Sequence, residues 1–487
     1  MTMPAIRIYV LCLLCLLTAP LASAQQTAKN LAHLFDSLEA RGGFNGCVLV
    51  AEEGKPIFSR AIGYANQDKK QLLNIRTDFE LASVSKQFTA LAIMQLKEKG
   101  KLTYDDSLKK YFPALPYKGI TLRHLLIHTS GLPEFLAFGK AEVDINRINY
   151  NKDILAVLSK AGDTTLFKPG TSFAYCNTNY LLLALIVEKV SGLPFARYMT
   201  QYVFNPAGML RTKVYARRAD KEPMDNYALS YIWDARLNKF IAPDSSITNA
   251  RAFYLDGVAG PYGISSNVED LLKWDQVLYT NKLVSAATLQ EAFTPGKKDD
   301  GSALKGIMGY GFGWIALPLN DSAIGASVYH TGGYPGYQSV ITRYLDKHKT
   351  VILLTNFYEK QNVNELTGII EDILFGHPYT IPAAKKMPRS VPVTTAQVQG
   401  FDGVYAMDQA PAVKMTITTR DSRVFAQLTG QSEYEVYASS ADTFFYTVVA
   451  ARLKFDKDKD GIVQKITLFQ NGQEMPMSRI KETTSKL

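Results

Sequence analysis

The apolar positions near the start of the chain follow the period of an α-helix. Leu31, Leu34, Phe35 and Leu38 recur at the three- and four-residue spacing of one helix face, so residues 25 to about 43 are predicted to form an amphipathic helix. Further helices are predicted from about Ser83 to Lys99, from about Asn179 to Ser191 and from about Asn362 to Phe375. Each of these three runs is followed at once by a glycine, a common signal for the end of a helix.

Short apolar runs predict strands at both ends of the same region. Residues 46–50 and 56–58 flank Glu53-Gly54, which is the pattern of a β-hairpin. Later strands are predicted at Ala326–His330, Tyr337–Tyr344 and Thr350–Thr355. Strands at both ends, with helices between and after them, indicate an α/β (α+β) domain with a mainly antiparallel sheet and a helical region.

The pattern changes near residue 378. Four prolines, at positions 378, 382, 388 and 392, lie within residues 378–395, which are therefore predicted to be a linker. Residues 396–487 are predicted to form a small all-β barrel or sandwich, because short alternating segments separated by turns follow one another there. The predicted strands are Gly403–Ala406, Val413–Thr419, Val424–Leu428, Glu433–Ala438, Thr443–Val449, Arg452–Phe455 and Ile462–Phe469.

The first residues have the features of an export signal. Arg7 precedes an apolar run from Ile8 to Leu17, and Ala22-Ser23-Ala24 provides small residues for cleavage. The run is short for a membrane anchor. We therefore expect residues 1–24 to be a signal peptide, residues 25–377 to form the main domain, and the protein to be exported to the periplasm or beyond the cell without stable membrane insertion after cleavage.

Composition indicates a folded protein and argues against a nucleic-acid partner. The 487 residues are 47% hydrophobic and 20% charged, as in ordinary globular proteins. The net charge of +9 is spread along the chain without a block of Lys and Arg, so a solvated basic surface is the preferred interpretation. The pattern does not indicate an oligomeric state. Cys12 and Cys15 lie in the predicted signal, and Cys47 and Cys176 are expected to be free thiols.

The first candidate chemical motif is Ser83-Val84-Ser85-Lys86. The three-residue spacing puts Ser83 and Lys86 on the same side of a helix, one turn apart. A serine hydroxyl needs a base within hydrogen-bond reach to become a nucleophile, and a desolvated lysine can be that base near neutral pH. Taken alone, the motif is weak, and a helix-capping serine beside a surface lysine is the more common explanation of such letters.

Two further motifs follow in the chain. In Tyr175-Cys176-Asn177, the tyrosine can transfer a proton if a neighbouring cation lowers its pKa, and the asparagine can bind both the lysine and a substrate amide. In the segment from His330 to Gly333, the two glycines would let a substrate carbonyl approach backbone N–H groups. His330 and Thr331 are candidates to bind a substrate carboxylate, although a plain turn after a strand gives the same letters.

Together, in this order, the three motifs resemble those of the serine β-lactamase and penicillin-binding-protein superfamily, in its class C-like branch. The resemblance covers roughly residues 28 to 376 and includes Phe79–Ala82, Leu125–Pro133 and Tyr310–Trp314. It implies a β-lactamase/transpeptidase-like fold with a cleft between the sheet and the helical region. The C-terminal segment resembles the lipocalin-like domains that accompany such hydrolases.

The resemblance also implies roles for the motif residues. Ser83 would be the acylated nucleophile, Lys86 its base, Tyr175 the proton shuttle and Asn177 a ligand of the substrate amide. His330, Thr331 and Gly332 would form the third motif, and the backbone N–H groups of Ser83 and Gly333 the oxyanion hole. No cofactor and no metal are implied.

Two positions depart from the family pattern. Cys176 stands where Ser or Ala is usual, and we expect little effect because its side chain should point away from the cleft. His330 replaces the lysine that often begins the third motif in β-lactamases. Because a histidine carries little charge at neutral pH, this replacement argues against efficient β-lactamase activity.

Two other patterns imitate metal sites. His124 and His128 have the spacing of zinc ligands on a helix, but Leu125 stands where H-E-x-x-H has its glutamate. Residues 456–461 imitate the start of an EF-hand loop, but Thr467 occupies the position of its final glutamate, and a polar hairpin turn is preferred.

The sequence therefore predicts an exported, metal-free serine hydrolase that acts through an acyl-enzyme. The expected substrate is a small molecule or a peptidoglycan-derived peptide or ester, most simply a D-alanyl peptide as for D-Ala-D-Ala carboxypeptidases. A class C-type β-lactamase, an esterase and a non-catalytic cell-wall-binding protein are the alternatives. Ser83, Lys86, Tyr175 and Asn177 together argue against the non-catalytic alternative, because a binding scaffold has no need of all four.

Overall fold

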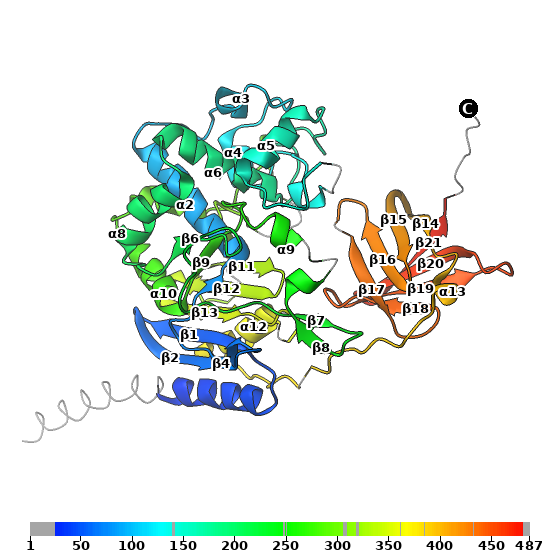
Figure 1. Ribbon diagram of the computed structural model, residues 1–487. Coiled ribbons are helices and arrows are strands. Elements are labelled where there is room, and N and C mark those ends of the chain that lie inside the picture. Colours follow the sequence, from blue (N-terminus) through cyan, green and yellow to red (C-terminus); the bar gives the residue numbers. More distant parts are fainter. Residues whose placement is uncertain are drawn as a thin grey trace, which may run out of the picture.

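The computed structural model describes residues 25–480, apart from 139–141, 247–248, 250, 305–308, 318–320, 361, 384 and 432. The predicted signal peptide lies outside the described residues. An α+β domain is followed by a β-barrel, and the linker joins them along one side of the molecule (Figure 1). The barrel lies beside the α+β domain rather than at the end of an extended tether.

A six-stranded sheet is the centre of the α+β domain. Its order is β10-β11-β12-β13-β1-β2, and every neighbouring pair is antiparallel. The strands are β10 (Ile315–Leu317), β11 (Ser327–Tyr334), β12 (Tyr337–Tyr344), β13 (Lys349–Thr355), β1 (Gly46–Glu52) and β2 (Lys55–Ile62). The first and last strands of the domain in the sequence thus pair in the middle of the sheet, as β1 beside β13, and this confirms the predicted antiparallel architecture.

The two faces of the sheet bury different cores. Along β1, Val48 and Val50 pack against the N-terminal helix (residues 25–40) and against α12 (Val363–Phe375). The alternate residues Cys47 and Leu49 pack into the larger core on the opposite face. This alternation follows from the two-residue period of a strand and explains why β1 is apolar from Cys47 to Ala51.

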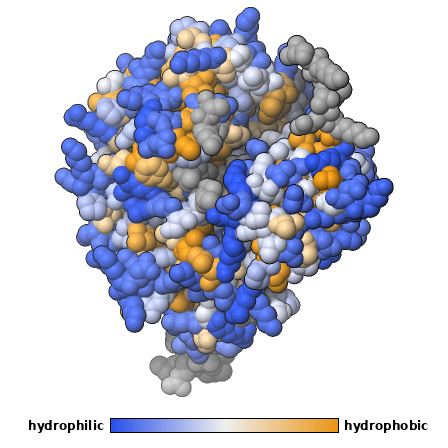
Figure 2. Space-filling model, turned by 45° about the vertical axis from the view of Figure 1, so that its right-hand side comes forward, coloured by the Kyte–Doolittle hydropathy of each residue, from blue (hydrophilic) through white to orange (hydrophobic). Residues whose placement is uncertain are grey.

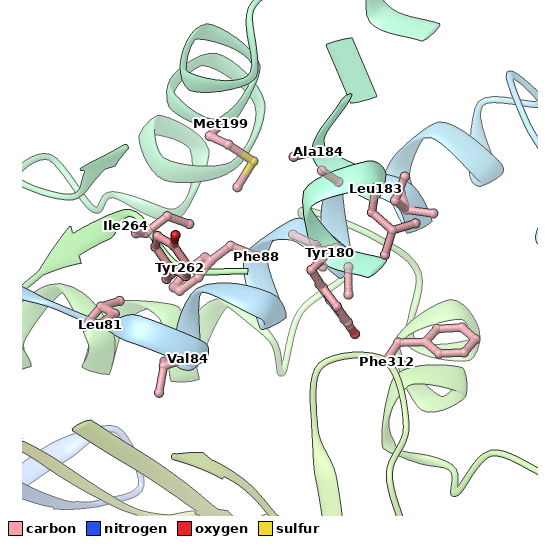
Figure 3. Packing of buried hydrophobic residues seen from close by; sticks show 14 of the residues in the cluster. Leu81, Val84, Phe88, Tyr180, Leu183, Ala184, Met199, Tyr262, Ile264 and Phe312 are labelled. Atoms are coloured by element: carbon pink, nitrogen blue, oxygen red, sulfur yellow. The ribbon is translucent and has the colours of Figure 1, made fainter. Parts of the chain in front are cut away.

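The larger core is built around two helices. α2 (Ser85–Glu98) and α6 (Asn177–Ser191) pack against each other, with Phe88 on one and Tyr180 and Leu183 on the other (Figure 3). α6 ends at Gly192, which has a φ of 72° and takes the left-handed conformation that favours glycine. Across the described ranges, no single helix has the length and hydropathy of a membrane span; only α6 with Phe195–Ala207 passes, as a pair bent by 77°.

Shorter elements connect these layers. The remaining helices of this domain are α3 (Leu108–Tyr111), α4 (Leu122–Leu126), α5 (Asn151–Lys160), α7 (Phe195–Met199), α8 (Asn205–Ala207), α9 (Arg251–Tyr254), α10 (Val268–Val277) and α11 (Ala286–Phe293). The remaining strands are β3 (Tyr64–Asn66), β4 (Gln71–Leu72), β5 (Phe79–Glu80), β6 (Lys213–Val214), β7 (Ile232–Asp234), β8 (Lys239–Ile241) and β9 (Ile264–Ser266).

The C-terminal region is a closed eight-stranded barrel with strands in sequence order, preceded by the short helix α13 (Thr395–Val398). Its strands are β14 (Gly403–Met407), β15 (Ala410–Arg420), β16 (Arg423–Leu428), β17 (Tyr434–Ala438), β18 (Thr443–Phe445), β19 (Ala451–Lys457), β20 (Val463–Gln470) and β21 (Gln473–Arg479). The sequence did not predict β21, because its residues are mostly polar and include Pro476. Yet β21 pairs with both β14 and β20 and thereby closes the barrel.

The barrel is attached to the hairpin of β7 and β8. Trp233 and Phe240 form a small apolar cluster with Tyr437 of the barrel, and the Trp233 indole donates to the carbonyl of Pro388 in the linker at 2.7 Å. Arg236 forms an ion pair with the Glu435 carboxylate of β17, which is buried. The contact joins the two parts through both apolar burial and a charge pair.

Candidate functional site

Ser83 lies in a tight turn immediately before α2. The turn (Ala82–Val84) is a 3₁₀ segment and α2 begins at Ser85, two residues later than the predicted helix. Ala82 has a φ of 49°, a left-handed conformation that is strained for a non-glycine residue. The buried Glu80 carboxylate stabilises the turn, because it accepts hydrogen bonds from the Ala82 N–H at 3.0 Å and from the Gly263 N–H at 2.9 Å.

The Lys86 ammonium group is at the centre of the site. Its Nζ donates to Ser83 Oγ at 3.0 Å, to Asn177 Oδ1 at 2.8 Å and to the carbonyl of Pro261 at 2.9 Å. The side chain is 0% exposed. Three oxygen atoms therefore replace the water that a surface lysine would have.

Burial changes the proton affinity of Lys86. Desolvation lowers its pKa from the usual 10.5 to about 7, and the nearby Glu134 carboxylate opposes that decrease. A substantial fraction of Lys86 is thus neutral near pH 7, and its Nζ is already within hydrogen-bond distance of Ser83. This is the arrangement that a lysine base requires.

Asn177 connects Lys86 to an acidic residue that the sequence analysis did not single out. Its Oδ1 accepts from Lys86, while its backbone N–H and its Nδ2 donate to one oxygen of Glu134 at 2.7 and 2.9 Å. The other oxygen of Glu134 accepts from the Leu136 N–H at 3.1 Å. Glu134 directly follows Leu125–Pro133, a segment that is part of the family resemblance. This position is the sequence signal that would have identified it.

Tyr175 lies over Lys86 and beside His128. The Lys86 Nζ is 4.8 Å from the centre of the tyrosine ring, and the His128 ring is 4.4 Å away from it, centre to centre. Burial raises the pKa of the Tyr175 phenol, with the Ser83 hydroxyl opposing that rise. In the resting site the Tyr175 phenol is therefore neutral, and its role as the proton shuttle stays a prediction.

His128 fixes the segment that carries Tyr175. Its Nδ1 accepts from the Cys176 N–H and lies 3.1 Å from Asn179 Nδ2, so Nδ1 is the unprotonated nitrogen of a neutral ring. Burial and the charge of Lys86 lower its pKa well below the usual value. His124 has different neighbours, Thr121 and Asp299, so the two histidines do not share a ligand site.

The third motif lies along β11, opposite the Ser83 turn. β10 pairs only with Ser327–Tyr329 of β11, so the next residues form a free edge that faces the turn. A Cβ on Gly332 would come within 2.2 Å of the Leu81 carbonyl oxygen, whereas a Cβ on Gly333 would have no neighbour closer than 3.7 Å. Gly332 therefore permits close packing of strand against turn, and Gly333 borders open space.

The His330 side chain is buried, and both of its ring nitrogens have partners within the protein. Its Nδ1 lies 2.6 Å from the Thr331 carbonyl oxygen, and its Nε2 lies 3.1 Å from the Tyr310 hydroxyl. Because a carbonyl only accepts, Nδ1 carries the proton and Nε2 accepts from the tyrosine. Burial lowers the pKa of His330 to about 3, so the ring is neutral and both nitrogens are occupied. The role of His330 as a ligand of a substrate carboxylate stays a prediction.

A cavity of about 460 Å³ opens beside these groups. Ser83, Asn177 and Gly333 line one side of it, and residues of the barrel line the other. The structure thus brings Ser83, Lys86, Tyr175, Asn177 and the His330–Gly333 segment together.

The structure also shows the surroundings of the two cysteines and of the EF-hand-like segment. Cys47 and Cys176 are free and buried, and the Cys176 thiol points to the carbonyl of Leu132 at 3.4 Å rather than into the cleft. In the EF-hand-like segment, Asp458 accepts from the N–H groups of Asp460 and Ile462, which is the geometry of a hairpin turn between β19 and β20.

The chain is similar to known proteins over most of its length. The Beta-lactamase family model matches residues 31–375. Penicillin-binding protein 4* of Bacillus subtilis is 36% identical over 458 residues, which cover 94% of this chain and 100% of that protein. The putative penicillin-binding protein PbpX of the same organism is 27% identical, over 68% of this chain and 75% of its own length.

Solved structures share the fold at lower identity. The octameric penicillin-binding protein homologue from Pyrococcus abyssi has a TM-score of 0.60 at 22% identity and covers 92% of this chain and 99% of its own. The D-amino acid amidase from Ochrobactrum anthropi has a TM-score of 0.58 at 21% identity, over 74% of this chain and 99% of its own. With the family match and the full-length relative, the chain belongs to the beta-lactamase family of penicillin-binding-protein-like serine hydrolases.

Proposed function

We propose that this protein is an acyl-enzyme hydrolase in which Ser83 is the nucleophile and Lys86 its general base. One observation carries the proposal: a lysine Nζ with a pKa lowered to about 7 lies 3.0 Å from a serine Oγ. Tyr175 and Asn177, which lie against Lys86, complete the proposed machinery.

The proposed reaction proceeds in two steps. Ser83 Oγ gives its proton to neutral Lys86 and attacks the substrate carbonyl, and the oxyanion is bound by the N–H groups of Ser83 and Gly333. Tyr175 donates its proton to the leaving group and regains one from Lys86. In the second step water gives a proton to Lys86 and attacks the ester carbonyl. The bond between the acyl carbon and Ser83 Oγ then breaks, Tyr175 protonates Ser83 Oγ and regains a proton from Lys86, and the acid is released.

For the substrate, we propose an amide of a D-alanyl peptide, as in D-Ala-D-Ala carboxypeptidases. The similarity to penicillin-binding protein 4* supports this assignment. The neutral His330, with both ring nitrogens occupied, favours a second candidate, an ester or amide without a carboxylate next to the leaving group. The same feature counts against a class C-type β-lactamase.

The first test measures intact mass over time after mixing residues 25–487 with benzylpenicillin, beside Ser83→Ala. A lasting adduct on the unmodified protein alone supports the peptidase-like function, and consumption of the antibiotic without a lasting adduct indicates a β-lactamase. Absence of both, with turnover of p-nitrophenyl acetate, indicates the second candidate. Equal labelling of Ser83→Ala would contradict the assignment of the nucleophile.

Export is part of the proposal. It rests on the Arg7, Ile8–Leu17 and Ala22–Ala24 pattern. Expression of the full chain in a Gram-negative host, followed by N-terminal sequencing of the periplasmic fraction, should give a chain that begins at Gln25. An unprocessed chain retained in the cytoplasm would contradict it.

A further inference from the structure

The barrel contributes the wall of the cavity opposite Ser83. Barrel residues that border this cavity include Met415, Ala426, Leu428, Tyr446 and Leu468. Met415, Ala426 and Leu468 also belong to the apolar interior of the barrel. The cavity beside the nucleophile therefore continues into the barrel.

One end of the barrel is filled and the other is open. The Phe401 and Phe455 rings stack at 4.2 Å between centres, and Phe444 meets Phe455 edge-on at 5.4 Å. The three rings fill the end of the barrel near Val424. At the opposite end, Met415 and its strand partner Leu428 border the cavity. A barrel that is filled by aromatic rings at one end and open at the other has the shape of a cup. Small barrels of this shape can hold one ligand.

The lining has polar and apolar surface in about equal shares, and its apolar part on the barrel includes Met415, Leu428, Val448, Val449 and Leu468. On the hydrolase side the lining includes Leu136, Ile232, Trp233 and Tyr262, together with polar residues such as Asn249. Among the described lining residues there is no lysine or arginine, and the acidic ones are Glu359 and Glu435. The Glu435 carboxylate is paired with Arg236 and Arg423, and Glu359 accepts from the Trp233 N–H at 2.9 Å. Glu435 thus serves the contact between the two domains and Glu359 a contact within the hydrolase domain, and the apolar part of the lining suits an uncharged apolar group.

The position of the cavity relative to the proton-transfer groups identifies which half of a substrate it holds. Ser83, Asn177 and Gly333 border the cavity, whereas Tyr175 and His330 do not. A leaving group must lie within hydrogen-bond distance of the residue that protonates it, which is Tyr175 in the proposed reaction. The leaving group therefore lies on the Tyr175 side, and the cavity faces the half that stays bonded to Ser83.

We propose that the open end of the barrel is the subsite for the acyl group, and that the protein prefers acyl donors with a bulky apolar acyl chain. The volume of about 460 Å³ is within the range of small-molecule sites. In the view of Figure 2, hydrophilic residues predominate on the surface and hydrophobic ones form separate patches. This inference rests on the proposed acyl-enzyme at Ser83 and defines the acyl half of its substrate.

A pair of isomeric esters tests the proposal. Methyl octanoate has its long chain on the acyl side, and heptyl acetate has the same atoms with the chain on the leaving side. We expect kcat/KM to be at least about tenfold higher for methyl octanoate, because its methylene groups leave water when the acyl chain enters the barrel. Equal values, or a preference for heptyl acetate, would overturn the proposal.

Barrel variants locate the effect. Val449 borders the cavity and is 41% exposed, so Val449→Asp should fold and should lower the ratio of octanoate to acetate turnover about fivefold or more, with p-nitrophenyl esters as substrates. Leu428→Gln is a second variant at a half-buried lining position. Val404→Asp is the matched control, because Val404 is 36% exposed on β14 and does not border the cavity.

The outcomes separate this inference from the proposed function. If Ser83→Ala removes all ester turnover but the ratio is the same in the unmodified protein, Val449→Asp and Leu428→Gln, the acyl-enzyme assignment stands and the barrel subsite is wrong. If Ser83→Ala retains full ester turnover, both fail. An equal fall of the ratio in Val404→Asp would also overturn the subsite.

Discussion

Asn177 donates two hydrogen bonds to a single oxygen of Glu134, one from its backbone and one from its side-chain amide. This double contact settles the orientation of the amide, with Nδ2 toward Glu134 and Oδ1 toward Lys86. Glu134 thereby acts on the base through another residue, which makes it a positioning residue. Its negative charge also raises the pKa of Lys86 against the effect of burial.

Glu134→Gln should lower kcat/KM for an ester substrate by about 10- to 100-fold, since it leaves a buried donor poorly paired at a cost of about 1–3 kcal/mol. Removal of the negative charge should also lower the pKa of Lys86 and move the acid limb of the pH profile to lower pH. Glu222→Gln, at an exposed position, is the matched control. A fall in rate with an unmoved acid limb would leave Glu134 a purely structural role.

The activity should depend on pH through Lys86. Its pKa is lowered to about 7, and only the neutral amine accepts the Ser83 proton, so kcat/KM should rise with pH and level off above about 7. Lys86→Arg should be inactive across this range, because a guanidinium stays protonated. Lys101→Arg, at an exposed site, should match the unmodified protein. A flat profile from pH 5 to 8 would exclude Lys86 as the base.

The two glycines of β11 should respond differently to the same substitution. Gly332→Ala places a methyl group 2.2 Å from the Leu81 carbonyl oxygen and forces strand and turn apart, so it should cost about 1–3 kcal/mol in the free energy of unfolding and most of the acylation rate. Gly333→Ala meets nothing closer than 3.7 Å and should change the midpoint of thermal unfolding little. Equal loss of stability in both variants would refute this assignment.

The attachment of the barrel should depend on the ion pair of Arg236 and Glu435. Because the Glu435 side chain is 1% exposed, Arg236→Ala weakens the pairing of a buried carboxylate and should destabilise the barrel by about 1.5–3 kcal/mol in denaturant unfolding. Arg420→Ala breaks the more exposed pair with Glu433 and should cost less than about 1 kcal/mol. Equal effects of the two variants would show that Arg236 does not hold the barrel.

The sequence by itself determined the architecture and the three motifs. Period-2 and period-3.6 patterns are local, so the central strands, the long helices and most barrel strands could be predicted from the printed letters. The spacing of Ser83 and Lys86 within one turn likewise fixed their proximity. The strand β21 was missed because its apolar signal is weak and its pairing comes from distant partners.

The tertiary structure alone decided the electrostatics of the site and what surrounds it. The lowered pKa of Lys86, the raised pKa of Tyr175 and the neutral His330 all result from burial by segments far apart in the sequence. Glu134 acts on Lys86 through Asn177, a residue 43 positions later in the chain. The open end of the barrel faces Ser83 because of how the barrel packs against the α+β domain. No local pattern of side chains encodes that packing.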